Sequence, residues 1–96
     1  MNARELRLWH WRTAMYARET ARRYEAEVTA WEKANQTRGP ARYSRQQAHV
    51  NNRKADFHIG AVQVMNDHPV CQAAGTTAEQ DDKLFPDRSN RKGMRK

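Results

Sequence analysis

The sequence predicts an all-α fold, in which a long antiparallel helical hairpin is followed by a short third helix and a basic C-terminal tail. No Gly or Pro occurs before Gly39, and the preceding stretch is rich in Ala, Arg, Glu, Leu and Met, which favour helices. Gly39 and Pro40 interrupt this stretch, and a second segment with helical apolar spacing follows them. We expect residues 1–69 to form the hairpin and residues 70–96 to form the short helix and the tail.

The first helix is expected to run from Asn2 to about Gln36. Asn2 is a typical N-cap residue, and Glu5 stands at the capping-box position three residues later. A helix of this length would extend roughly 50 Å, so a partner must support it along its length. One apolar stripe, which we call the first stripe and expect to face helix two, consists of Leu6, Trp9, Thr13, Tyr16, Ala17, Thr20, Tyr24, Val28 and Trp31.

A second line of side chains follows the opposite face of the same helix. It mixes large apolar groups with arginines at alternating spacings of four and three residues. A single partner helix can cover only one of the two faces. We call this line the Arg/Trp/Met stripe, and it consists of Arg4, Leu8, Trp11, Met15, Arg18 and Arg22.

The second helix is expected to begin at Pro40 or Ser44 and to end near Asn66, before His68 and Pro69. An antiparallel register in which the numbers of facing residues add to about 81 would pair Tyr24 with Phe57 and Glu27 with Lys54. The apolar line expected to face helix one consists of Tyr43, Val50, Phe57, Ala61, Val64 and Met65, interrupted by Gln47 and Lys54.

The chain after Pro69 has a different character. Gly75 indicates a turn, and Thr76 with Glu79 forms a capping-box pattern that predicts a short helix ending near Phe85, before Pro86. Residues 87–96 are polar and basic, a composition typical of a segment that is disordered by itself.

Size and composition limit what this chain can be. With 96 residues, 38% of them hydrophobic and 30% charged, it is at most one domain with a thin core. Such a core usually needs a disulfide, a metal or a second chain. Cys71 is the single cysteine, so an intrachain disulfide is excluded and a reducing compartment is favoured. The net charge of +7 predicts an acidic partner, either nucleic acid or an acidic protein surface.

No targeting or membrane segment is expected. No apolar run approaches the roughly 20 residues that span a bilayer, and the N-terminus lacks the apolar core of a signal peptide. We therefore expect a soluble cytoplasmic protein with no membrane partner. No family resemblance emerges, although small basic helical chains of this style are frequent among phage accessory and assembly proteins.

Candidate metal and catalytic groups are sparse. His68 and Cys71 have the spacing of two zinc ligands, and the expected register places His10 near them, but the usual paired CxxC or HxxxH elements are missing. We expect His10 and His68 to lie at the surface and Cys71 to be buried. Asp81 and Asp82 are adjacent and do not share a helix face, and no Gly-rich phosphate loop is present. We expect no enzymatic activity, no metal and no cofactor.

The Arg/Trp/Met stripe is the candidate partner-binding site, because Trp and Arg are enriched at interface hot spots and Met suits adaptable contacts. The partner would be another copy of the chain or an acidic protein target. In the alternative, Leu84 and Phe85 pack on Leu8 and Trp11 within one chain. A second function class is nucleic-acid association. The candidate phosphate-binding residues are Arg38, Arg42, Arg45, Arg53, Arg88, Arg91, Lys92, Arg95 and Lys96, with Lys54 beside them.

Overall fold

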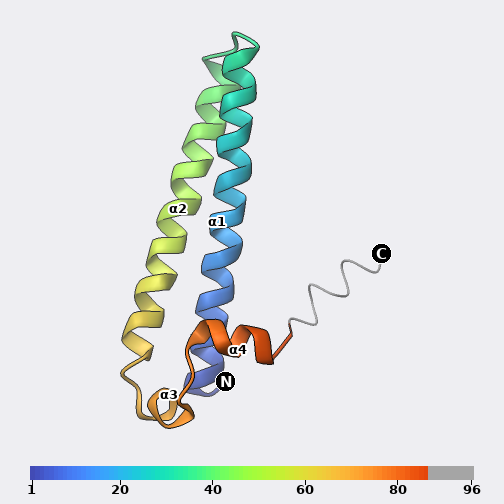
Figure 1. Cartoon of the computed structure of the whole chain (residues 1–96). Coiled ribbons are helices and arrows are strands. Elements are labelled where there is room, and N and C mark those ends of the chain that lie inside the picture. The colour runs from blue at the N-terminus through green and yellow to red at the C-terminus, as the bar shows by residue number, and fades with distance from the viewer. Residues whose placement is uncertain (87–96) are drawn as a thin grey trace.

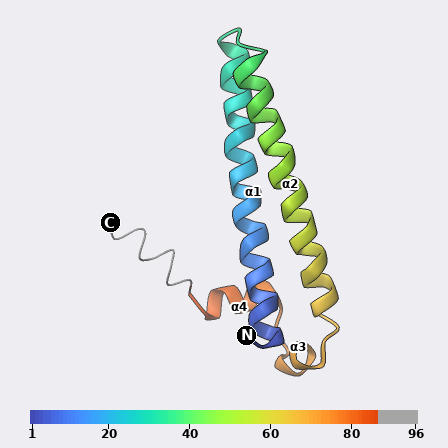
Figure 2. The same ribbon diagram turned by 180° about the vertical axis from the view of Figure 1, so that it is seen from behind.

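The computed structural model describes residues 1–86, and its regular elements in that range are four helices (Figure 1). Helix α1 spans Ala3–Lys33 and helix α2 spans Gly39–Met65. The two lie side by side in opposite directions, whereas α3 (Pro69–Ala74) and α4 (Ala78–Leu84) lie at the end of the hairpin that holds the N-terminus (Figures 1 and 2). The predicted all-α hairpin with a short additional helix is confirmed. Residues 87–96, predicted to be disordered, lie outside the described residues.

The ends of the helices follow local sequence signals. The Asn2 side chain accepts a hydrogen bond from the Glu5 N–H (2.8 Å), and the Glu5 carboxylate accepts one from the Asn2 N–H (3.2 Å), so the predicted capping box is confirmed. Helix α2 begins at Gly39 with Pro40 in its first turn, where the missing N–H of proline costs no hydrogen bond.

The segment after α2 contains one helix more than the sequence predicted. Helix α3 is capped by His68, whose Nδ1 accepts a hydrogen bond from the Val70 N–H (3.2 Å), and it ends at Gly75, whose positive φ of 67° suits glycine. The capping box of α4 pairs Thr77 with Gln80, one residue later than expected. Helix α4 ends at Leu84, as predicted to within one residue.

Small residues line the interface between α1 and α2. Ala14, Ala17 and Ala55 are fully buried and form the core cluster, against which Met15 and Ile59 pack. The remaining buried small residues recur at heptad spacing on both helices, which is the pattern of two helices wound closely together. They are Ala21 on α1 and Ala41, Ser44 and Ala48 on α2.

The expected register is wrong. The numbers of hydrogen-bonded partners across the hairpin add to between 68 and 77, as in His10–His58, Arg18–Asn52, Glu27–Ser44 and Glu32–Arg45. Only residues 34–38 separate α1 from α2. Residues equally distant from the middle of such a short turn must face each other, so their numbers add to about 72. The predicted register would have required a turn centred near residue 40 instead of residue 36.

The predicted pairs are accordingly absent. Phe57 is 70% exposed rather than packed on Tyr24, and the Tyr24 ring instead meets the Tyr43 ring edge to face at 6.3 Å. The Glu27 carboxylate accepts a hydrogen bond from Ser44 Oγ (3.0 Å) rather than pairing with Lys54. The alanine lines occupy the hairpin interface and turn the large apolar side chains of both helices outward.

Candidate functional site

A buried carboxylate joins α4 to the start of α1. The Asp81 side chain is fully buried and accepts hydrogen bonds from Arg4 Nε (3.0 Å) and Nη2 (2.7 Å), from Arg7 Nη2 (3.2 Å) and from Thr76 Oγ1 (2.8 Å). The hydrogen bonds from Arg4, with smaller contributions from Thr76 and Arg7, lower the pKa of Asp81 to about 2 against the opposing effect of burial. This pair of arginines on one aspartate fixes α4 across the N-terminal end of α1.

The Arg/Trp/Met stripe is largely occupied by contacts within the chain. Leu8 is buried, and the Arg4 guanidinium lies 5.3 Å from the centre of the Phe85 ring in addition to binding Asp81. Arg18 donates to Asn52 Oδ1 (3.0 Å) and to Asp56 Oδ1 (2.5 Å) of α2. Trp11 and Met15 are half-buried, and Arg22 is exposed. A partner-binding role for this stripe remains a prediction, and its members do not form one continuous exposed surface.

The basic residues proposed for nucleic-acid binding are spread over the outer surface of α2. Arg38, Arg42, Arg45 and Arg53 are all exposed, and Arg45 forms an ion pair with Glu32 (3.1 Å). The five basic residues predicted in the tail, Arg88, Arg91, Lys92, Arg95 and Lys96, lie outside the described residues.

Large apolar side chains gather along one side of the hairpin. We call this surface the aromatic face. On a helical wheel its members lie beyond one edge of the alanine interface and most of them point away from the partner helix, whereas the Arg18–Asn52 contact lies at the opposite edge. All of its members are exposed: Leu6, Trp9 and Tyr16 on α1, and Tyr43, Val50, Phe57 and Val64 on α2.

A histidine of α2 connects the aromatic side chains of the two helices. The His58 ring meets the Trp9 ring edge to face at 5.4 Å and the Phe57 ring at 5.2 Å. Its Nδ1 lies 2.8 Å from Nδ1 of His10, so in the neutral pair one nitrogen donates and the other accepts. Burial, and then the neighbouring His10 and Lys54, lower the pKa of His58 below its usual value. His10, which was predicted to lie at the surface, is half-buried, because the true register places its ring against His58.

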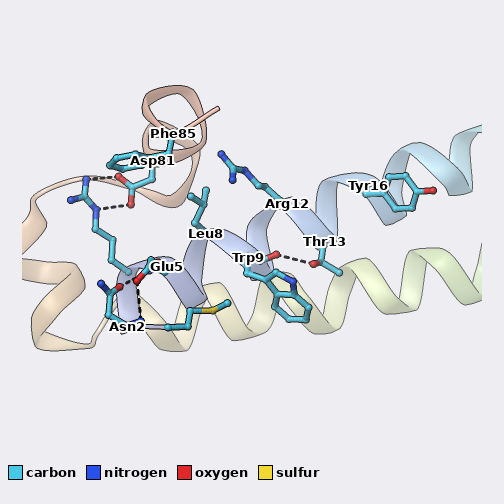
Figure 3. Close-up of a pocket in the computed structure, with 11 residues that line it drawn as sticks. Asn2, Glu5, Leu8, Trp9, Arg12, Thr13, Tyr16, Asp81 and Phe85 are labelled. Carbon is cyan, nitrogen blue, oxygen red and sulfur yellow. Dashed lines mark hydrogen bonds and ion pairs between the residues drawn. The ribbon is translucent and has the colours of Figure 1, made fainter. Parts of the chain in front are cut away.

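The aromatic face continues around α1 into an open groove beside α4. The groove has a volume of about 840 Å³, and Figure 3 shows Leu8 and Phe85 facing each other at one end while Trp9 and Tyr16 extend along α1. Arg12 stands between these groups and pairs through Nε with Asp82 Oδ1 (2.6 Å). Apolar surface dominates this wall of the hairpin, with charged groups held in place by ion pairs.

His68 and Cys71, the candidate metal ligands, lie beside and within α3. No cluster of three or more His, Cys, Asp or Glu side chains suited to a metal occurs in residues 1–86. Cys71 is buried and His68 is exposed, as expected, but His68 serves as the cap of α3. None of the described helices is long and apolar enough to cross a membrane.

Comparison with known proteins adds no relative. No protein-family model matches the chain, and neither the curated proteins nor the solved structures contain a match. The candidate site therefore rests on geometry alone. Sequence reasoning missed the aromatic face because it assigned Trp9, Tyr16 and Phe57 to the core. The repeated alanines Ala14, Ala17 and Ala21 were the signal that could have located the true interface.

Proposed function

We propose that this chain is a small basic α-helical interaction protein that binds another protein chain through its aromatic face. It acts by occluding, bridging or assembling surfaces and performs no chemistry of its own. The observation that carries the proposal is the exposure of seven large apolar side chains on one side of the hairpin. Large exposed apolar surfaces usually mark interaction sites, and aromatic side chains are frequent among the residues that dominate binding energy.

The internal contacts explain why this face is favoured over the Arg/Trp/Met stripe. Arg4, Leu8 and Arg18 already contact α2 or α4, or are buried by them, and would have to break those contacts to meet a partner. The side chains of Trp9, Phe57 and Val64 need no such rearrangement. A surface already in its binding conformation avoids the ordering cost of association.

Site-specific photo-crosslinking tests this proposal. A photoreactive phenylalanine analogue replaces Phe57 in the full chain, which is expressed in its native host, and the matched control places the same analogue at Gln63, an exposed position of α2 outside the aromatic face. We expect a protein adduct of defined mass from position 57, unchanged by nuclease, and none from position 63. Equal labelling from both positions, or no protein adduct from position 57, would contradict the proposal.

A second candidate function is nucleic-acid association, which the exposed cations of α2 favour. Arg42, Arg53 and Lys54 are exposed and have no ion-pair partner within residues 1–86. Such cations can neutralise phosphates and make binding strongly dependent on salt. The same crosslinking experiment separates the two functions, because a nucleic-acid adduct at position 57 is destroyed by nuclease.

A further inference from the structure

Helix α2 carries two heptad lines, and the hairpin covers only one of them. Ala41, Ala48, Ala55 and Val62 are spaced seven residues apart and are buried at the interface with α1. A second line with the same spacing lies on the aromatic face and is exposed. It consists of Tyr43, Val50, Phe57 and Val64, and it alternates with a further line of Gln47, Lys54 and Ala61.

The alternating spacing of four and three residues is the pattern of a seam that packs against another helix. The corresponding positions of α1 beside this seam carry Leu6, Thr13 and Thr20, with Trp9 and Tyr16 at the outer edge. A helix packed on this seam would lie along the outer side of α2. The spacing of the side chains in this seam thus favours a helical occupant over a loop or a strand.

One cation interrupts the seam at its middle. Lys54 lies one residue from Ala55 and three from Phe57, and it is close enough to His58 to lower the pKa of that ring. Lys54 is exposed, and within residues 1–86 it forms no ion pair. The carboxylate next along the helix, Asp56, is held by Arg18 on the other side of the hairpin. Arg53, the neighbour of Lys54 in the sequence, is also exposed, so the centre of the seam is positively charged.

We infer that the occupant of the aromatic face is an acidic amphipathic helix of another protein, which places a carboxylate against Lys54. This inference rests on the proposed function and specifies the partner. A helix that covers Phe57 and Val50 also removes water from the ammonium group of Lys54. A buried charge without a partner is strongly unfavourable, whereas a carboxylate from the incoming helix compensates it. A single charged position in an apolar seam also fixes the register of the partner.

Charge also argues against the other occupants. In a two-fold pair of copies that meet along this seam, both copies present the same positively charged patch, because an isologous interface uses one patch twice. The chain carries a net charge of +7, which adds to this repulsion. A nucleic acid would satisfy Lys54 and Arg53 but would leave the aliphatic side chains of Val50 and Val64 against a charged backbone.

Two synthetic peptides test the inference with the full chain. Each has about three heptads with Leu at the core positions, and they differ only in charge: one carries Glu at the central core position and on its flanks, and the other carries Lys there. Binding of the labelled peptides is followed by fluorescence anisotropy at about 0.15 M salt. We expect the acidic peptide to bind at least about tenfold more tightly than the basic one.

Three variants complete the design. Phe57→Ser should abolish binding of the acidic peptide, and Lys54→Glu should reverse the preference between the peptides. Leu84→Ser removes a similarly exposed apolar side chain of α4, outside the aromatic face, and should leave binding unchanged. Circular dichroism verifies that each variant is folded, which is expected because all three side chains are exposed.

The outcomes distinguish the inference from the proposed function. If both peptides bind equally well and Phe57→Ser abolishes this binding, the inference of an acidic partner is overturned, but the aromatic face is still a protein-binding surface. Failure of both peptides, together with a protein adduct from position 57 in the crosslinking experiment, overturns the inference alone. A Phe57-dependent dimer in sedimentation that excludes the peptides assigns the face to a second copy. Oligonucleotide binding that is lost in Phe57→Ser assigns it to nucleic acid.

Discussion

Replacing Asp81 by Asn should release α4 from the hairpin, because it removes the charge that holds two arginines. Asp81 is fully buried, and Arg7 is only 2% exposed. The pKa of Asp81 falls from 3.8 to about 2 on folding, which corresponds to about 2 kcal/mol of stabilisation of the carboxylate. The substitution also leaves the Arg7 guanidinium buried without a counter-charge. We therefore expect a total loss of about 3–5 kcal/mol, as for other broken buried ion pairs.

Urea unfolding at pH 7, followed by circular dichroism, measures this loss, and amide hydrogen exchange in residues 78–84 shows whether α4 is released first. The matched control is Asp82→Asn, which breaks the neighbouring ion pair with Arg12. That pair is partly exposed, so its loss should cost at most about 1 kcal/mol. Equal and small effects of the two substitutions, with unchanged exchange in α4, would refute the role assigned to Asp81.

The same carboxylate predicts how stability depends on acid. A group whose pKa is lowered by folding stabilises the folded state fully above its unfolded value, and this contribution is lost as the pH falls through its folded value. For Asp81 the free energy of unfolding should therefore decline between about pH 4 and pH 2. The Asp81→Asn variant should lack this part of the decline, and a decline of the same size in both proteins would contradict the assignment.

Three further predictions follow from the packing and the charges. Phe57→Ser should change the free energy of unfolding by no more than about 0.5 kcal/mol, because the side chain is exposed. Ala55→Leu should lower the free energy of unfolding by about 1–3 kcal/mol, because the larger side chain overfills the interface. Urea unfolding that shows the reverse order would support the register expected from the sequence. The pKa of His58 is lowered on folding, so the free energy of unfolding should be constant above about pH 6.5 and should fall below that pH. An unchanged urea midpoint between pH 8 and pH 5 would exclude a contribution of His58 to the pH dependence of stability. If the chain binds nucleic acid, log affinity should fall with log salt by about 0.7–0.9 per phosphate contact, and deletion of residues 87–96 should reduce that slope; affinity that is indifferent to salt would remove the alternative.

The sequence by itself determined the helices and most of their ends. The capping box of Asn2 and Glu5, the break at Gly39 and Pro40, and the stop before Pro86 are interactions between neighbours in the chain, so they are legible without a tertiary structure. The charge and the single cysteine likewise need only counting. The helix at Pro69–Ala74 was missed although His68, Pro69 and Gly75 carry its start and stop signals.

The tertiary structure decided which faces meet. Two competing lines run along each long helix, one of large apolar side chains and one of alanines, and periodicity alone ranks the larger residues first. The short turn at 34–38 fixes the register, and close packing of the two backbones then requires the small side chains of Ala14 and Ala55 between them. This packing of the alanine lines leaves Phe57 and Trp9 exposed. The fold also brings Asp81 to Arg4 and Arg7, although these residues are more than 70 positions apart in the sequence. Only the folded arrangement of the helices determines such long-range pairs, because no local pattern records them.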